Sequence, residues 1–245
     1  MKKLFLIGCL ALTIACQGVT ATPKADTRSM AATQSQPVSA TATQTAVPAS
    51  TFTPTPVPQF FTEEFNADMS AWTSFQTGGA QAPVAKLENG MLRVDFSSPN
   101  TWYYAIHNAH KYSDVYVSAK FVGTPSGSVG LICDYSESNG WYEFNIASDG
   151  SYSVLFGRLL AEGIAQYTPI VTDTTEYLHA GNFDYEIGLT CSENILLLHI
   201  NKKLFRKLDV SRFELTEGKI GINASSFEET PMIATFDWVK VGAPE

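Results

Sequence analysis

The sequence predicts an all-β protein that folds as an antiparallel two-sheet β-sandwich. From residue 60 onward, about a dozen short apolar or aromatic runs follow one another, with turn residues every 8–12 positions. Many of these runs alternate apolar and polar residues, which is the period of a strand with one buried face. No stretch of this region predicts a long helix. Together these patterns are typical of a sandwich of short strands.

The strands before residue 129 begin with an aromatic-rich segment. Residues 60–65 read FFTEEF and predict an edge strand, and residues 66–72 predict a loop or short helical turn that places Trp72 under the fold. A hairpin follows, because Asn89-Gly90 is a strong signal for a tight turn between two apolar runs. Its two strands and the next two are expected at residues 84–87, 91–96, 102–106 and 114–122.

A three-stranded meander over residues 129–157 is the clearest prediction. Its strands read VGLICDY, WYEFNI and SYSVLFG, and the turns between them contain Asn-Gly and Asp-Gly. Both dipeptides favour the positive φ angles of tight hairpin turns. The remaining strands are expected to pack against this meander.

The strands after the meander are less regular at first. Residues 164–170 are expected to continue the sheet, interrupted at Pro169, which has no backbone N–H to donate. Residues 195–200 read ILLLHI, and this continuous apolar run predicts a fully buried strand. The other strands are expected at residues 183–191, 204–210, 219–224 and 232–241.

Residues 1–15 predict a signal peptide. Two lysines precede an apolar core, Leu4 to Ile14, that is too short to span a bilayer as a stable helix. The core leads into Cys16 in a context that resembles a bacterial lipobox, although Thr13 stands where Leu is usual. We therefore predict lipidation of Cys16 and an exported lipoprotein, anchored at the outer face of a bacterial membrane. Ordinary secretion with cleavage nearby is the alternative.

Residues 16–59 predict a disordered tether. Of the 43 residues from 17 to 59, 28 are Thr, Ala, Ser or Pro, and none is Leu, Ile, Trp or Tyr. Such a segment cannot bury enough apolar surface to offset its chain entropy. The folded domain is therefore expected at residues 60–245.

The charge of this domain excludes one class of partner. Residues 60–245 contain 12 Lys or Arg and 23 Asp or Glu, so their formal net charge is −11. Nucleic acids need a basic surface, and an anionic polysaccharide is disfavoured for the same reason.

Cys133 and Cys191 are the only cysteines of the domain, and both lie in apolar runs. In an oxidising compartment such a pair is expected to form a disulfide, worth roughly 4 kcal/mol on the chain-entropy model. A metal pair is disfavoured because no His or Cys lies at ligand spacing. A reactive thiol is disfavoured because no basic neighbour would lower its pKa.

The order of the motifs resembles a known group over residues 60–243. The matching segments are Glu64-Phe65, Asn89-Gly90, residues 130–135, residues 141–146 with Asp149-Gly150, residues 189–191, residues 196–201, residues 218–221 and residues 236–239. This set is similar to the concanavalin A-like jelly rolls, specifically the laminin-G-like and family 16 glycoside hydrolase-related modules. The resemblance implies a jelly-roll sandwich in a group that contains both enzymes and non-enzymes.

The catalytic signature of that group is absent here. Its hydrolases carry Glu-x-Asp-x-x-Glu or Glu-x-Asp-x-Glu on one inward strand, where two carboxylates share the chemistry. The counterpart strand at residues 141–146 offers only Glu143, with Asn145 beside it on the same face. We therefore expect a non-catalytic domain, with a divergent glycoside hydrolase as the second alternative.

A carbohydrate site is the leading functional hypothesis. Sugars bind to aromatic faces flanked by a few polar groups. The concave sheet that the resemblance implies is rich in such residues, and we favour Tyr104, Tyr135, Trp141, Glu143 and Arg158. The first alternative is that these aromatics belong to the core of a structural or protein-interaction module.

A structural calcium ion is the second expected site. Related jelly rolls hold such an ion between the first strand, an early Gly turn and a late Asp, which here implies Glu64, the backbone oxygen of Gly90, and Asp237. Calcium takes oxygen ligands from such mixed sources. The alternative is that Asp237 simply faces solvent. No other cofactor is implied.

Overall fold

The computed structural model describes residues 57–123 and 126–244. The signal peptide at residues 1–15, the lipidation site at Cys16 and nearly all of the tether at residues 16–59 lie outside the described residues, so these remain predictions. The described part belongs to one compact unit, Pro54–Glu245. Within that part no helix is long and apolar enough to cross a membrane.

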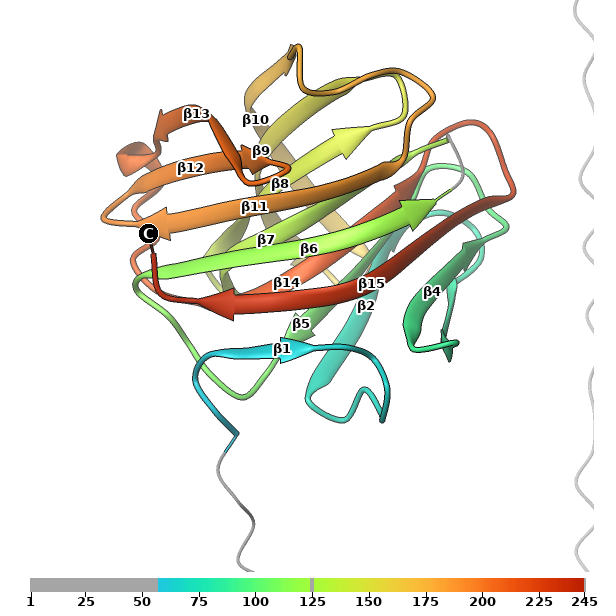
Figure 1. Cartoon of the computed structure of the whole chain (residues 1–245), viewed down its shortest axis with the longest axis horizontal. Helices are drawn as coiled ribbons and strands as arrows, with labels where there is room; N and C mark the ends of the chain where they lie inside the picture. Colours follow the sequence, from blue (N-terminus) through green and yellow to red (C-terminus); the bar gives the residue numbers. More distant parts are fainter. Residues whose placement is uncertain (1–56, 124–125, 245) are drawn as a thin grey trace, which may run out of the picture. The chain divides into compact units, whose positions relative to one another are not determined.

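The first of two antiparallel sheets has eight strands (Figure 1). Their spatial order is β13-β12-β11-β6-β15-β4-β3, and β1 pairs with β15 outside this path. The strands are β1 (Phe61–Glu63), β3 (Val84–Glu88), β4 (Met91–Phe96), β6 (Val115–Gly123), β11 (Asp184–Ser192), β12 (Ile195–Ile200), β13 (Lys203–Asp209) and β15 (Met232–Gly242).

The second sheet has seven strands in the order β10-β9-β8-β7-β14-β5-β2. They are β2 (Trp72–Gly78), β5 (Thr101–His107), β7 (Ser128–Ser136), β8 (Gly140–Ala147), β9 (Ser151–Ala161), β10 (Ile164–Thr174) and β14 (Lys219–Ser226). A single 3₁₀ turn, Ser211–Phe213, is the only helical element of the described residues. The predicted fold class, a two-sheet antiparallel sandwich, is confirmed.

The local turn signals are also confirmed. Asn89 and Gly90 both have positive φ angles, +55° and +72°, and join β3 to β4 as a tight hairpin. The predicted meander forms the adjacent strands β7, β8 and β9. Strand β10 runs past Pro169 to Thr174, because a register shift next to Pro169 absorbs the interruption.

Two expectations for individual strands are corrected. Residues 66–71 form the expected loop and Trp72 is buried in the core, but Trp72 also begins strand β2, whose mostly polar sequence predicted no strand. Strand β12 is not fully buried: Leu196, Leu198 and Ile200 are buried, whereas the residues between them are only half-buried. The outer face of the first sheet is uncovered there, so alternation persists despite the apolar sequence.

The main core lies between the two sheets. On β4 every second residue, Leu92, Val94 and Phe96, is buried against it. The predicted disulfide between Cys133 of β7 and Cys191 of β11 is confirmed, with Cα atoms 6.5 Å apart. It ties one sheet to the other through the core.

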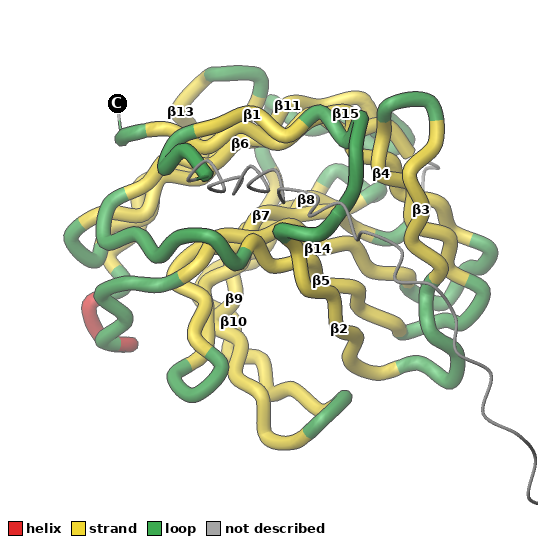
Figure 2. Tube along the Cα trace, turned by 90° about the horizontal axis from the view of Figure 1, so that it is seen from below, coloured by secondary structure: helices red, strands yellow, loops and turns green. Residues whose placement is uncertain are grey.

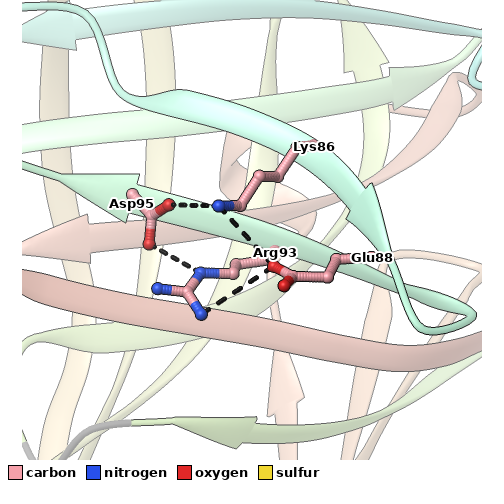
Figure 3. A network of polar contacts seen from close by, with 4 residues as sticks. All are labelled: Lys86, Glu88, Arg93 and Asp95. Carbon is pink, nitrogen blue, oxygen red and sulfur yellow. Dashed lines mark hydrogen bonds and ion pairs between the residues drawn. The ribbon is translucent and has the colours of Figure 1, made fainter.

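The outward side of the β3–β4 hairpin carries a closed ring of ion pairs (Figure 3). Lys86 Nζ lies 3.5 Å from Glu88 Oε2 and 3.4 Å from Asp95 Oδ2. Arg93 Nε lies 2.8 Å from Asp95 Oδ1, and its Nη1 lies 3.9 Å from Glu88 Oε2. All four side chains stay partly exposed, so solvent screens these pairs.

The second sheet is strongly curled. Figure 2 shows β9 and β10 on one side and β5 and β2 on the other, bending toward each other around the face that points away from the core. The backbones of the two edges are joined where the N–H of Gly78 donates to the carbonyl of Gly163 at 3.2 Å. We call the enclosed surface the concave face.

Candidate functional site

The concave face carries a second apolar cluster, separate from the main core. Its fully buried members are Tyr104, Ile106, Ile132 and Trp141, and its half-buried members are Phe75, Trp102, Tyr135, Leu159, Ala165 and Tyr167. Strand alternation produces the separation, because neighbours such as Tyr103, Leu131 and Tyr142 point into the main core instead. The curled sheet therefore has apolar side chains on both faces.

Glu143 lies fully buried within this cluster. Trp141 Nε1 donates to its Oε2 at 2.9 Å, and Asn145 Nδ2 donates to its Oε1 at 3.0 Å. Burial raises the pKa of Glu143, and the hydrogen bonds from Trp141 and Asn145 oppose that rise. The carboxyl group thus has defined protein partners rather than access to solvent.

The packing around Glu143 also explains two glycines. A side chain at Gly130 would collide with the amide oxygens of Asn145 and Asn223, and a side chain at Gly157 would collide with the ring of Trp141. Glycine at these two positions therefore allows the backbone to pack directly against these polar and aromatic groups.

One half of the concave face is closed by the protein itself. The Tyr167 hydroxyl from β10 lies 2.6 Å from the Tyr104 hydroxyl and 2.8 Å from Thr77 Oγ1 of β2, so it bridges the two edges. Trp102 stacks on the Tyr167 ring at 5.9 Å. Burial, with the nearby charge of Glu143, raises the pKa of Tyr167 to about 12, so its hydroxyl stays protonated at neutral pH. A ligand cannot reach Trp141 or Glu143 through this half.

The other half is open and forms a groove with a volume of about 940 Å³. We call it the open groove. Its apolar lining residues are Phe75, Ile106, Tyr135, Leu159, Leu160 and Ala161. Its polar lining residues are Thr73, Ser74, Gln76, Asn108, Glu137, Glu162 and Lys219.

The rings of the groove are held in place from below. Phe75 stacks on Tyr104 with ring centres 4.7 Å apart, and Tyr135 lies 5.7 Å from the ring of Trp141. At the rim, Lys219 Nζ donates to Asn108 Oδ1 at 2.7 Å. The groove is therefore a fixed aromatic surface beside an ordered polar pair.

The five residues predicted for carbohydrate binding do not share one environment. Tyr104, Trp141 and Glu143 lie together but are fully buried. Tyr135 alone lines the open groove. Arg158 is exposed and donates to Gln166 Oε1 at 3.2 Å. It lies on the opposite side of β9, because its neighbours Gly157 and Leu159 are the residues that meet the concave cluster.

Sequence reasoning missed Phe75, Leu159, Asn108 and Lys219 as groove residues. The sequence does contain a signal for Phe75, since Thr73, Phe75 and Thr77 alternate with Ser74 and Gln76 as in a strand. Leu159 is one position from the predicted Arg158. No local pattern places Asn108 and Lys219 together, because they are 111 positions apart.

The predicted calcium ligands come to one region of the first sheet. Glu63 pairs with Val239 of β15 and Leu92 of β4 pairs with Phe236, so Glu64, Gly90 and Asp237 each lie within a few residues of the same stretch of β15. Asn66 links two of them: its Nδ2 donates to Glu64 Oε2 at 3.3 Å, and its Oδ1 borders Gly90. Glu64 and Asp237 are exposed. Among the described residues, no three His, Cys, Asp or Glu side chains form a group suited to a metal ion.

No protein-family model matches the chain, and no curated protein sequence matches it. Solved structures share its fold at low sequence identity. The carbohydrate-binding module CBM66 from Bacillus subtilis aligns with a TM-score of 0.52 at 15% identity, over 72% of this chain and 98% of that one.

Two further structures place this chain in the same fold. The β-glucanase of Bacillus licheniformis aligns with a TM-score of 0.52 at 14% identity, over 76% of this chain and 98% of that one. A protein of unknown function with a galectin-like fold from Bacillus subtilis aligns with a TM-score of 0.51 at 11% identity, over 75% and 94%. All three are concanavalin A-like jelly-roll sandwiches, and this chain shares that architecture, as the resemblance implied. At these identities the likeness establishes the fold alone.

Proposed function

We propose that this jelly roll is a non-catalytic carbohydrate-binding domain and that the open groove is its binding site. The observation that carries the proposal is the pairing of the Phe75 and Tyr135 rings with the Asn108–Lys219 pair in one groove. Aromatic rings stack on the apolar faces of sugars, an amide group can donate to and accept from sugar hydroxyls, and an ammonium group donates to them. The predicted sugar is neutral, because the domain carries a net charge of −11.

Glu143 supports binding rather than hydrolysis. Two-carboxylate hydrolysis needs a second carboxylate about 5–9.5 Å away, and it needs access for sugar and water. Glu143 is enclosed, and the partners of its carboxylate are the indole N–H of Trp141 and the amide of Asn145. In this proposal Glu143 organises the base of the cluster and does not touch the ligand.

A divergent glycoside hydrolase is the second candidate, and one observation favours it. Glu137 and Glu162 both line the open groove, from the turns that follow β7 and β9. Both side chains are exposed. We favour binding because neither lies against an enclosed apolar wall that would keep a general acid protonated.

An array of neutral oligosaccharides and polysaccharides, probed with the purified chain, tests the proposal. Tyr135→Ala is expected to weaken binding roughly tenfold, because it removes a stacking ring. Tyr135→Phe, which keeps the ring, is expected to bind nearly as the unmodified chain does. Tyr177→Ala is the matched control, since Tyr177 is a half-buried tyrosine outside the lining of the groove.

Two outcomes would count against a non-catalytic carbohydrate-binding domain. One is the absence of binding to any sugar, which would favour a structural or protein-interaction module. The other is release of new reducing ends from a bound glucan, lost in Glu137→Gln or Glu162→Gln, which would favour the hydrolase.

The setting of the domain is also part of the proposal. We expect export, lipidation at Cys16 and display at the outer face of a bacterial membrane on the tether at residues 16–59. The disulfide between Cys133 and Cys191 supports export, because such bonds persist in oxidising compartments. Loss of membrane association in Cys16→Ser is the expected result, measured by fractionation of cells that express each form.

A structural calcium ion at Glu64, Gly90 and Asp237 is proposed as well. The pairing of β1 and β4 with β15 supports it, since this pairing gathers the three positions. Asp237→Asn is expected to reduce the rise in melting temperature that calcium produces.

A further inference from the structure

A small pocket lies at one end of the sandwich and shares no lining residue with the open groove, although Asp134 in this pocket directly precedes Tyr135 in the groove. Its lining comes from both sheets: Asp134 belongs to the end of β7, Asp114 immediately precedes β6, and Ser192 ends β11. Its volume is about 150 Å³, which is room for an ion with water. The disulfide between Cys133 and Cys191 adjoins it, since Asp134 and Ser192 each follow one of its cysteines.

Asp134 is the unusual member of this pocket. Only 7% of its surface is exposed, and its Oδ1 is buried without a hydrogen-bond partner. Burial, and then the charge of Asp114, raises the pKa of Asp134 to about 7. A buried carboxylate without partners is costly for a fold unless a cation or donor completes it.

The backbone holds Asp134 in this position. Asp134 has a φ angle of +52° and lies in an irregular step of the β7–β8 pairing, between Cys133 and Ser136. Gly218 packs so closely on the backbone of Asp134 that any side chain at position 218 would collide with it. The surrounding backbone therefore fixes the position from which the Asp134 side chain projects.

The pocket has apolar walls from Ile195, Leu196, Val210 and Leu215, and its other lining residues carry side-chain oxygens of mixed kind. The carboxylate of Asp114 accepts from Ser192 Oγ at 2.5 Å and from Ser113 Oγ at 3.3 Å. Asn194 and Thr216 add neutral oxygens to the lining. None of the ion pairs among residues 57–123 and 126–244 includes Asp114 or Asp134. The pocket thus combines the unneutralised carboxylates of Asp114 and Asp134 with neutral oxygens, and the exposed carboxylate of Glu193 also borders it.

We propose that this pocket binds a calcium ion, with the carboxylates of Asp134 and Asp114 as its charged ligands and water completing the shell. Calcium takes six to eight oxygen ligands in flexible geometry, and two carboxylates with neutral oxygens match that chemistry. The ion would link the ends of β6 and β7, which belong to different sheets. This site shares no residue with the one proposed at Glu64, Gly90 and Asp237, and it does not depend on carbohydrate binding.

Calcium titration of the purified full chain, by calorimetry and by thermal unfolding, tests the site. The affinity is expected near 10⁻⁴ to 10⁻³ M, roughly the range of extracellular modules. Saturating calcium is expected to raise the melting temperature by about 5 °C over the chelated protein. Asp134→Asn and Asp114→Asn are each expected to weaken binding at this site by at least roughly tenfold.

Two controls separate this site from other effects. Asp237→Asn is expected to leave binding at the Asp134 pocket intact, because it alters only the other candidate site. In chelator, Asp134→Asn is expected to unfold at or above the melting temperature of the unmodified chain, because it removes a buried charge. If Asp134→Asn fails to fold, Asp114→Asn still tests calcium binding. Asp114 is exposed, so its substitution is expected to leave the fold intact. Calcium binding by both variants at the unmodified affinity, or no response of the unmodified chain to millimolar calcium, would overturn the proposal.

Discussion

Glu143 and Asp134 are both buried acids on neighbouring strands of the second sheet, yet their surroundings differ. Glu143 on β8 accepts hydrogen bonds from Trp141 and Asn145, in a cluster closed by the protein's own side chains. Asp134 on β7 has a buried oxygen with no partner and lines a pocket. The difference indicates that Glu143 is a structural acid, whereas Asp134 is poised for a ligand.

The largest expected effect concerns Glu143. Glu143→Ala leaves the indole N–H of Trp141 and the amide of Asn145 without their acceptor and opens a cavity. We expect the free energy of unfolding to fall by about 4 kcal/mol. Chemical denaturation measures this change. A fall of less than about 1 kcal/mol would contradict the structural role of Glu143. Glu143, like Asp134, would then be a buried acid that the fold does not require.

The next effect is a pH dependence that arises from Asp134. Its pKa rises from 3.8 to about 7 on folding, so the folded chain holds the proton to higher pH than the unfolded chain does. In chelator, the free energy of unfolding is therefore expected to fall by roughly 3 kcal/mol as the pH rises from about 4 to above 7. Asp134→Asn is expected to remove this part of the pH dependence. An unchanged profile would show that Asp134 does not differ from an ordinary acid.

A smaller effect tests the closure above Glu143. Tyr167→Phe removes the hydroxyl that bridges Tyr104 and Thr77 and keeps the ring that stacks on Trp102. We expect the free energy of unfolding to fall by about 1–2 kcal/mol. We also expect faster hydrogen exchange at the amide of Gly78, which donates a hydrogen bond to the opposite edge. Unchanged exchange at Gly78 would show that this hydroxyl does not hold the edges together.

The smallest effect is expected for the exposed charges on β3 and β4 (Figure 3). Arg93→Ala breaks contacts to Asp95 and Glu88, yet water can replace them because the side chains are partly exposed. The free energy of unfolding is expected to fall by about 0.5 kcal/mol, and by less at high salt. A loss as large as that of Glu143→Ala would mean that the ring of ion pairs acts as a cooperative unit.

Local patterns predicted the fold well. Asn89-Gly90 identified one hairpin, and the Asn-Gly and Asp-Gly turns identified the meander, since these signals act over a few residues. The disulfide between Cys133 and Cys191 was predicted because both cysteines lie in apolar runs and the expected compartment is oxidising. Strand β2 was missed because its sequence, WTSFQTG, is mostly polar and has only two large apolar side chains, Trp72 and Phe75.

The site was harder to predict for two reasons. Alternation correctly grouped Tyr104, Trp141 and Glu143 on one face, but it could not show that β2 and β10 close over them, because that contact joins Gly78 to Gly163. Arg158 illustrates the second reason. Adjacent residues of a strand point to opposite faces, so an error of one position selects Arg158 instead of Leu159, which lines the groove.

The short strand β1 determines how the domain would respond to a force applied at its N-terminal side. It pairs with β15 over only three residues, Phe61 to Glu63, and just before it Tyr112 donates to the carbonyl of Gln59. Force applied through the preceding residues would first load the contact between His110 and the carbonyl of Val57 and then these few bonds, while the disulfide between β7 and β11 lies outside that load path. Detachment of β1 under tension would thus leave the cross-linked sandwich and its open groove intact.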